Sequence, residues 1–166
     1  MDARARHSFP AAERELTIRR TFEAPRALVF KAWTEPQHLA RWSCPRGFTF
    51  TENSGDLRVG GTFAARMRSP QGSDHRLRGV YREIVPPDRS VHMESYDDYP
   101  GDSQVTAVFV EEGGKTTLTA TVLYPSREVR DIVLKSGMEH GAAETYDKLA
   151  EMLAADRGIE RGAGDS

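Results

Sequence analysis

The chain contains very little cysteine and no long apolar run, and these two absences exclude several classes of protein. Cys44 is the only cysteine among 166 residues, which excludes an internal disulfide and a metal site built from several thiolates. No stretch approaches the roughly 18 apolar residues that a membrane-spanning helix requires. Residues 1–10 also lack the apolar segment of a secretory signal. We therefore expect a cytoplasmic protein that makes no membrane contact.

An excess of charge of either sign is also absent. The chain has 23 basic and 25 acidic residues, a net charge of −2, so its bulk charge does not attract nucleic acid. The histidines are dispersed and form no HExxH motif. They are His7, His38, His75, His92 and His140. We expect no nucleic-acid partner, no metal and no other cofactor.

The two ends of the chain are poorly suited to packing. Residues 1–13 are charged and have no consistent period, and residues 156–166 are charged and rich in glycine. Between these ends there is no internal repeat, low-complexity tract or linker. The sequence predicts one domain over residues 14–155, flanked by a flexible N-terminal tail and a flexible C-terminal tail.

Alternation of apolar and polar residues predicts about six to seven β-strands. Most are consecutive and joined by tight turns, a pattern typical of an antiparallel meander. The expected strands are Leu16–Phe22, Phe48–Phe50, Phe63–Arg68, Arg76–Arg82, Val91–Tyr96, Ser103–Val110 and Thr116–Tyr124.

Helical periodicity appears after the first strand and at the end of the chain. A helix is expected to begin at Pro25 and end before Pro36, and a short second one to cover Gln37–Arg41. A long helix is predicted over Arg127–Ala155, capped by Ser126. Its apolar stripe changes sides near Gly137, which predicts a bend there.

A curved antiparallel sheet around a long C-terminal helix, with two short helices after the first strand, is the α+β helix-grip arrangement. The sequence resembles the activator of heat-shock protein 90 ATPase homologue-like family, within the START-related (SRPBCC) superfamily. The matching motifs are Arg20-x-Phe22-x-Ala24-Pro25-x-x-Leu28-Val29-Phe30-x-Ala32-Trp33, His38-Leu39-x-x-Trp42, Val59-Gly60-Gly61-Thr62-Phe63, Met67-x-x-Pro70-x-Gly72, Gly79-x-Tyr81-x-Glu83-Ile84-x-Pro86-Pro87, Thr116-x-Leu118-Thr119, and Ser136-Gly137-Met138 with Leu149.

This resemblance implies the fold more closely than the activity, because one fold supports many functions. Relatives include co-chaperone domains linked to the stress response, lipid and hormone binders, and polyketide cyclases. Many relatives carry a second tryptophan where this chain has Ser43 after Trp42. Ligand preference is therefore not carried over from the family.

The inner face of the predicted sheet combines methionine, aromatic and small residues, as an adaptable apolar pocket requires. Small residues such as Gly79 and Ala65 are expected to leave volume unfilled, whereas His92 is expected to point away from the cavity. The predicted lining residues are Trp42, Phe48, Phe63, Met67, Tyr81, Met93, Phe109, Met138, Ala142 and Tyr146.

These patterns favour non-catalytic binding of a small apolar or amphipathic molecule by a monomer or weak homodimer. One alternative is a protein-interaction or co-chaperone-like domain that stimulates a chaperone ATPase. An array of arginines along two adjacent strands is then either a solvated outer face or a docking patch for an acidic partner. Its members are Arg66, Arg68, Arg76, Arg78 and Arg82.

A second alternative is a cyclase- or hydrolase-type enzyme that uses the same cavity. The sequence identifies no catalytic residue, and only Tyr81 and Tyr96 are plausible polar groups for the pocket.

The pocket entrance is predicted from two proline-containing loops and the bend in the long helix. The segments Thr34–Gln37 and Ser43–Gly47 are expected to border it, together with Gly137. Trp42 lies between the two loops as a large amphipathic side chain. We expect it to form a wall of the pocket rather than part of a filled core.

Overall fold

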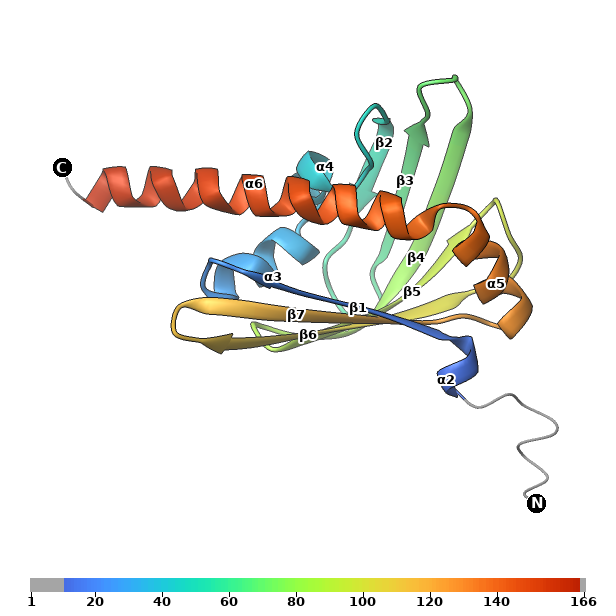
Figure 1. Ribbon diagram of the computed structural model, residues 1–166, viewed down its shortest axis with the longest axis horizontal. Coiled ribbons are helices and arrows are strands. Elements are labelled where there is room, and N and C mark those ends of the chain that lie inside the picture. The colour runs from blue at the N-terminus through green and yellow to red at the C-terminus, as the bar shows by residue number, and fades with distance from the viewer. Residues whose placement is uncertain (1–10, 165–166) are drawn as a thin grey trace, which may run out of the picture.

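The computed structural model describes residues 11–164 and contains one seven-stranded antiparallel sheet with helices on its concave face (Figure 1). The predicted α+β helix-grip fold is confirmed. Along the chain the elements are α2 (Ala11–Arg14), β1 (Glu15–Phe22), α3 (Arg26–Thr34), α4 (Pro36–Trp42), β2 (Thr49–Gly55), β3 (Thr62–Arg68), β4 (Asp74–Val85), β5 (Arg89–Tyr96), β6 (Ser103–Glu112), β7 (Lys115–Leu123), α5 (Arg127–Lys135) and α6 (Met138–Gly164).

The sheet has the order β1-β7-β6-β5-β4-β3-β2, so the meander from β2 to β7 is confirmed. The first strand closes the far edge by pairing with the last one, from Glu15 opposite Leu123 to Phe22 opposite Thr116. Helices α3 and α4 connect β1 to β2, which lie at opposite edges of the sheet. This crossing places the two short helices over the concave face.

The sheet is strongly curved. In Figure 1, β1, β7 and β6 run in nearly the same direction as α6, whereas β2, β3 and β4 rise steeply behind it. Helix α6 packs on α3 and α4. The main core lies between these helices and the β1, β6 and β7 end of the sheet. It includes Phe22, Val29, Phe30, Phe109, Leu118, Leu149 and Leu153.

The predicted single C-terminal helix is two helices, and the predicted bend at Gly137 is confirmed as a break. Gly137 has φ +85°, a left-handed conformation that glycine adopts readily. Ser126 caps α5 as expected, with its hydroxyl accepting a hydrogen bond from the backbone N–H of Val129 at 3.1 Å. Helix α6 continues to Gly164, past the predicted end at Ala155.

None of the helices in the described part of the chain is long and apolar enough to cross a membrane.

Candidate functional site

A cavity of about 250 Å³ lies between the curved sheet and the helices α3, α4 and α6. Its lining comes mostly from aromatic and aliphatic side chains, with a small number of polar ones. It is formed by Ile18, Trp33, Thr34, Pro36, Leu39, Trp42, Ser43, Phe50, Asn53, Ser54, Phe63, Ala65, Met67, Leu77, Tyr81, Ile84, Ser90, His92, Glu94, Tyr96, Val105, Ala120, Val122 and Tyr146.

The cavity meets solvent between α4 and β2. Asn53 and Ser54 both line it and are exposed, whereas the lining residues on the central strands are buried or half-buried. The Asn53 side-chain amide donates a hydrogen bond to the Pro36 backbone carbonyl at 2.9 Å, which ties β2 to α4 at this opening. Thr34, Pro36 and Ser43 belong to the lining, as the entrance prediction requires, but Gly137 does not.

Stacked aromatic rings form the helical wall of the cavity. The rings of Trp33 and Trp42 stack with centroids 5.6 Å apart, and Tyr146 meets each of them edge-on at 6.2 Å. Trp42 is only 4% exposed and belongs to the main core as well as to the lining. Trp42 was predicted to be a wall of the pocket rather than part of the core, and in the structure it is part of both.

Trp42 also completes the hydrogen bonding of the neighbouring helix. Its indole N–H donates to the carbonyl of Ala32 at 2.8 Å. In a continuing helix that carbonyl would accept from the residue four positions later, which is Pro36 and has no N–H. The indole therefore satisfies a buried acceptor that the proline leaves without its helical partner.

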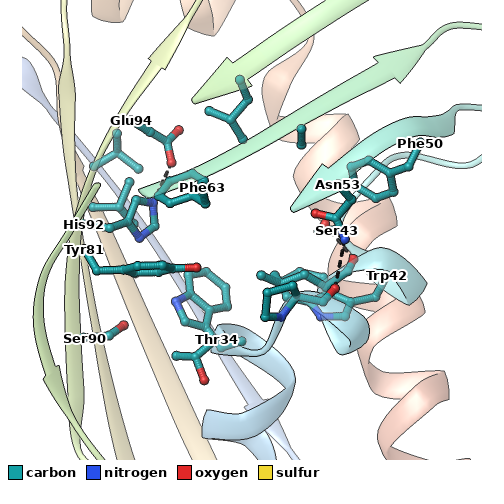
Figure 2. A pocket seen from close by; sticks show the side chains of 18 of the residues that line it. Thr34, Trp42, Ser43, Phe50, Asn53, Phe63, Tyr81, Ser90, His92 and Glu94 are labelled. Atoms are coloured by element: carbon teal, nitrogen blue, oxygen red, sulfur yellow. Dashed lines mark hydrogen bonds and ion pairs between the residues drawn. The ribbon is translucent and has the colours of Figure 1, made fainter. Parts of the chain in front are cut away.

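A histidine–carboxylate pair faces the cavity from β5. The Nε2 atom of His92 lies 2.8 Å from a carboxylate oxygen of Glu94, and each side chain is 17% exposed. Residues two apart on a strand project from the same face, so one strand supplies both groups. Figure 2 shows this pair and Tyr81 on the opposite side of the cavity from Trp42, Ser43 and Asn53.

Tyr81 is the cross-strand neighbour of this pair, and its hydroxyl points into the cavity (Figure 2). Tyr81 and His92 are directly opposite each other in the β4–β5 pairing, and both line the cavity. Tyr81 is 7% exposed, and burial raises the pKa of its phenol, so the hydroxyl stays a hydrogen-bond donor at neutral pH. The ring of Phe63 packs on both neighbours, 5.1 Å from Tyr81 and 5.3 Å from His92.

The cavity contains one carboxylate, that of Glu94, and no lysine or arginine among its described lining residues.

The negative charge of Glu94 also raises the pKa values of nearby tyrosines at the end of the sheet that α5 covers. Burial is the largest cause that raises the pKa of Tyr124 to about 12, and the charge of Glu94 raises it further. Tyr96 and Tyr99 have raised pKa values for the same two leading reasons.

Five of the predicted site residues line the cavity: Trp42, Phe63, Met67, Tyr81 and Tyr146. Phe109 points inward but is covered by α3, where its ring meets Phe30 at 5.2 Å. Ala142 is half-buried on α6 and does not reach the cavity, because α6 contributes only Tyr146 to the described lining. The Met138 side chain lies outside the described part of the structure.

Phe48 was wrongly assigned to the second strand and to the cavity. Its backbone N–H donates to the Pro45 carbonyl at 3.1 Å, so it closes a turn before β2 begins at Thr49. Its ring instead contacts His75, with centroids 6.0 Å apart.

The predicted orientation of β5 was also wrong. We expected Val91 and Met93 to point inward and His92 to point outward, because apolar residues usually face a core. In the structure the alternate set lines the cavity, whereas Met93 lines a second hollow and is not part of the cavity lining. This inner set is Ser90, His92, Glu94 and Tyr96.

The alternating polar residues of β5 were the available signal for this site. An irregularity between Tyr81 and Glu83 on β4 shifts the strand register. The shift keeps both Tyr81 and Ile84 in the lining. Because the side-chain period of a strand is two, such a shift decides which partners share a face. The alternation within β5 showed that its polar residues share one face, but it did not show that this face is the inner one.

A curved sheet that encloses a cavity against a C-terminal helix defines a helix-grip domain of the START-like kind. The family model described as activator of Hsp90 ATPase homolog 1-like protein matches residues 23–154. The chain therefore belongs to this family, as its motifs indicated. No curated protein matches the sequence significantly.

Solved structures of bacterial proteins share this fold. A crystal structure from Rhodobacter sphaeroides is 34% identical, with a TM-score of 0.80 over 88% of this chain and 96% of that one. A Nitrosomonas europaea protein is 24% identical, with a TM-score of 0.80 over 89% and 98% of the two chains. A Silicibacter pomeroyi protein titled AHSA1 is 21% identical, with a TM-score of 0.71 over 86% and 99%. The latter two support the fold alone.

Proposed function

We propose that this protein binds a small apolar or amphipathic molecule in the cavity between its sheet and helices. The observation that carries the proposal is a predominantly apolar cavity in which His92, Glu94 and Tyr81 lie together on one side (Figure 2). Small-molecule sites commonly combine a large apolar surface with a small number of orienting polar groups. The proposed location of the protein is the cytoplasm.

The cavity volume favours a small ligand. At about 250 Å³ it lies just below the roughly 300–1,000 Å³ typical of small-molecule sites. A single substituted aromatic ring suits this space better than a long-chain lipid does. The stacked rings of Trp33 and Trp42 would provide a flat apolar surface for it.

The experiment is a fluorescence titration with butylbenzene and 4-butylphenol. Trp33 and Trp42 are the only tryptophans and both line the cavity, so intrinsic emission reports on its occupancy. Ala65 lies on the cavity face of β3, and Ala65→Phe should fill the space and abolish the saturable change. Ala64 is its neighbour on the other face of the strand, and Ala64→Phe should leave binding intact.

Saturable binding that Ala65→Phe removes and Ala64→Phe preserves is the expected result. Linear titrations with both probes, or binding that survives in Ala65→Phe, would contradict the proposal. A thermal melt of each variant identifies any variant that has lost its fold.

An enzyme that uses the same cavity is a second candidate, favoured by the His92–Glu94 pair. A carboxylate that holds one imidazole nitrogen leaves the other available as a base. With a benzyl ketone, Nδ1 of His92 would take a proton from the carbon next to the carbonyl while Tyr81 donates a hydrogen bond to the carbonyl oxygen. Exchange of the proton on Nδ1 of His92 with solvent, followed by its transfer back to that carbon, would regenerate both groups.

Hydrogen–deuterium exchange at carbon in phenylacetone, followed by NMR in heavy water, tests this candidate. Exchange faster than the buffer rate, lost in His92→Phe and retained in His140→Phe, would support it. His140 is a suitable control because its side chain is 85% exposed on α6. An exchange rate equal to that of buffer would rule out this chemistry for the probe.

A co-chaperone-like role in the stress response is the third candidate, and the family description favours it. The predicted arginine array supplies a surface: Arg66 lies directly opposite Arg76, while Arg68 and Arg78 pair with Asp74 and Asp97. The test measures chaperone ATPase turnover with the wild-type chain and with Arg66→Glu/Arg76→Glu. Stimulation that the double variant loses would support this role, and no stimulation would contradict it.

A further inference from the structure

The polar groups of the cavity divide into two sets that differ in hydrogen bonding. Near the opening, two of the polar side chains already donate hydrogen bonds to the protein backbone. Asn53 donates to the Pro36 carbonyl, and the Ser43 hydroxyl donates to the Leu39 carbonyl at 2.7 Å. Nδ1 of His92 on the opposite side, and the Tyr81 hydroxyl, which points from that side into the cavity (Figure 2), have no hydrogen-bond partner within the described residues, although both side chains line the cavity. The Tyr81 hydroxyl and Nδ1 of His92 can therefore form new hydrogen bonds with a ligand head group without breaking an existing one.

The chemistry of this side follows from the His92–Glu94 contact. A carboxylate only accepts hydrogen bonds, so the hydrogen between the two groups lies on Nε2 of His92. In the neutral ring, Nδ1 then carries the lone pair and accepts. The neighbouring Tyr81 hydroxyl supplies a donor, and it can also accept.

The same region is unsuited to an anion. No lysine or arginine side chain is among the described lining residues, and Glu94 contributes a negative charge beside the histidine. Bringing a carboxylate ligand here would remove its charge from water and place it near another carboxylate. Both effects disfavour binding.

We propose that the cavity selects ligands with a neutral hydroxyl head group, such as phenols, and excludes the matching carboxylates. The hydroxyl donates to Nδ1 of His92 and accepts from the Tyr81 hydroxyl, while the apolar body of the ligand lies along the Trp33 and Trp42 rings. This inference rests on the proposed ligand-binding function and specifies its ligand class.

The test compares three probes at pH 8 that share a butyl-substituted benzene ring and differ in the head group. They are butylbenzene, 4-butylphenol and 4-butylbenzoate. Wild-type protein should bind the phenol at least about tenfold more tightly than the benzoate, a difference of about 1.4 kcal/mol. The phenol should also bind more tightly than butylbenzene. Tryptophan fluorescence supplies the dissociation constants, and calorimetry confirms them.

Two variants separate the contributions of His92 and Glu94 to ligand affinity. His92→Phe removes the acceptor, so phenol affinity should fall about tenfold while butylbenzene affinity changes little. The control His140→Phe should change neither. Glu94→Gln keeps a carbonyl oxygen for Nε2 but removes the charge, so it should retain phenol binding and narrow the gap between phenol and benzoate. This second variant gives a result even if His92→Phe does not fold.

The outcomes distinguish this inference from the function on which it rests. If no probe binds saturably, the ligand-binding function itself fails. If butylbenzene and the phenol bind but the benzoate binds equally well, the function stands and the proposed selectivity is overturned. Tighter binding of cationic 4-butylbenzylamine than of the phenol would also overturn it, because the head group would then be a cation held by Glu94.

Discussion

The ring of Phe63 lies over the backbone of Gly79, in the space that a side chain at residue 79 would occupy. An ideal Cβ at Gly79 would lie 2.3 Å from Cζ of Phe63 and 2.1 Å from the Met93 carbonyl oxygen. The same ring supports Tyr81 and His92. Gly79 was expected to leave unfilled cavity volume, whereas in the structure the ring of Phe63 occupies that volume.

Gly79→Ala should therefore destabilise the protein by about 3 kcal/mol, because a ring and a strand carbonyl would both have to move. Urea unfolding measures the change. The variant should also weaken 4-butylphenol binding, since Phe63 would no longer hold His92 in place. A loss of stability below about 0.5 kcal/mol would contradict the close contact.

Gly141→Ala is the matched change at a glycine that has space. It lies in α6, where the nearest atom to a new Cβ would be Cγ of Pro45 at 3.7 Å, an ordinary contact distance. Alanine is favoured over glycine within a helix by roughly 0.5–1 kcal/mol. The melting temperature should therefore rise, and a fall would indicate that α6 is not helical at this position.

Trp42→Phe should cost about 1–3 kcal/mol, because it leaves the Ala32 carbonyl without a hydrogen bond while retaining an aromatic ring. Trp42→Ala should cost on the order of 3–5 kcal/mol, since it also opens a cavity in the core. Unfolding by urea, followed by circular dichroism, gives both values. Equal costs for the two variants would show that the hydrogen bond, rather than the packing, dominates.

Cys44 should react slowly with thiol reagents in the folded protein. It is 4% exposed, and burial raises the pKa of its thiol despite the opposing effect of Lys148. Alkylation at pH 8 should accelerate at least tenfold, as an order-of-magnitude expectation, when urea unfolds the chain. Equal rates in folded and unfolded protein would contradict the burial of this thiol.

Stability should fall at alkaline pH because the buried tyrosines hold their protons more tightly in the folded state. The Tyr124 pKa is raised from 10.0 to about 12. Its stabilising contribution is complete below about pH 10, where the unfolded chain is still protonated, and is lost as pH rises toward 12.

Tyr124→Phe should reduce the slope of unfolding free energy against pH in this range, as measured by urea titration. Glu94→Gln should also reduce it, because the charge of Glu94 contributes to the raised pKa. A slope unchanged by either substitution would contradict this origin of the alkaline sensitivity.

Local sequence determined most of the secondary structure and the fold class. Pro25 precedes α3, Ser126 caps α5, and Gly137 interrupts the C-terminal helix, as the residue types indicate. These features depend on backbone conformations that a proline, a hydroxyl or a glycine favours within a few residues. The ordered family motifs then indicated how these elements assemble.

Tertiary structure decided which side chains share the cavity. Tyr81 and His92 become neighbours through the pairing of β4 with β5, and the register shift near Glu83 fixes which residues oppose each other. Periodicity within β5 favoured the opposite face, because His92 and Glu94 are polar residues on an inner surface. The contact between them is made over two residues of one strand, but only the position of that strand directs it into the cavity.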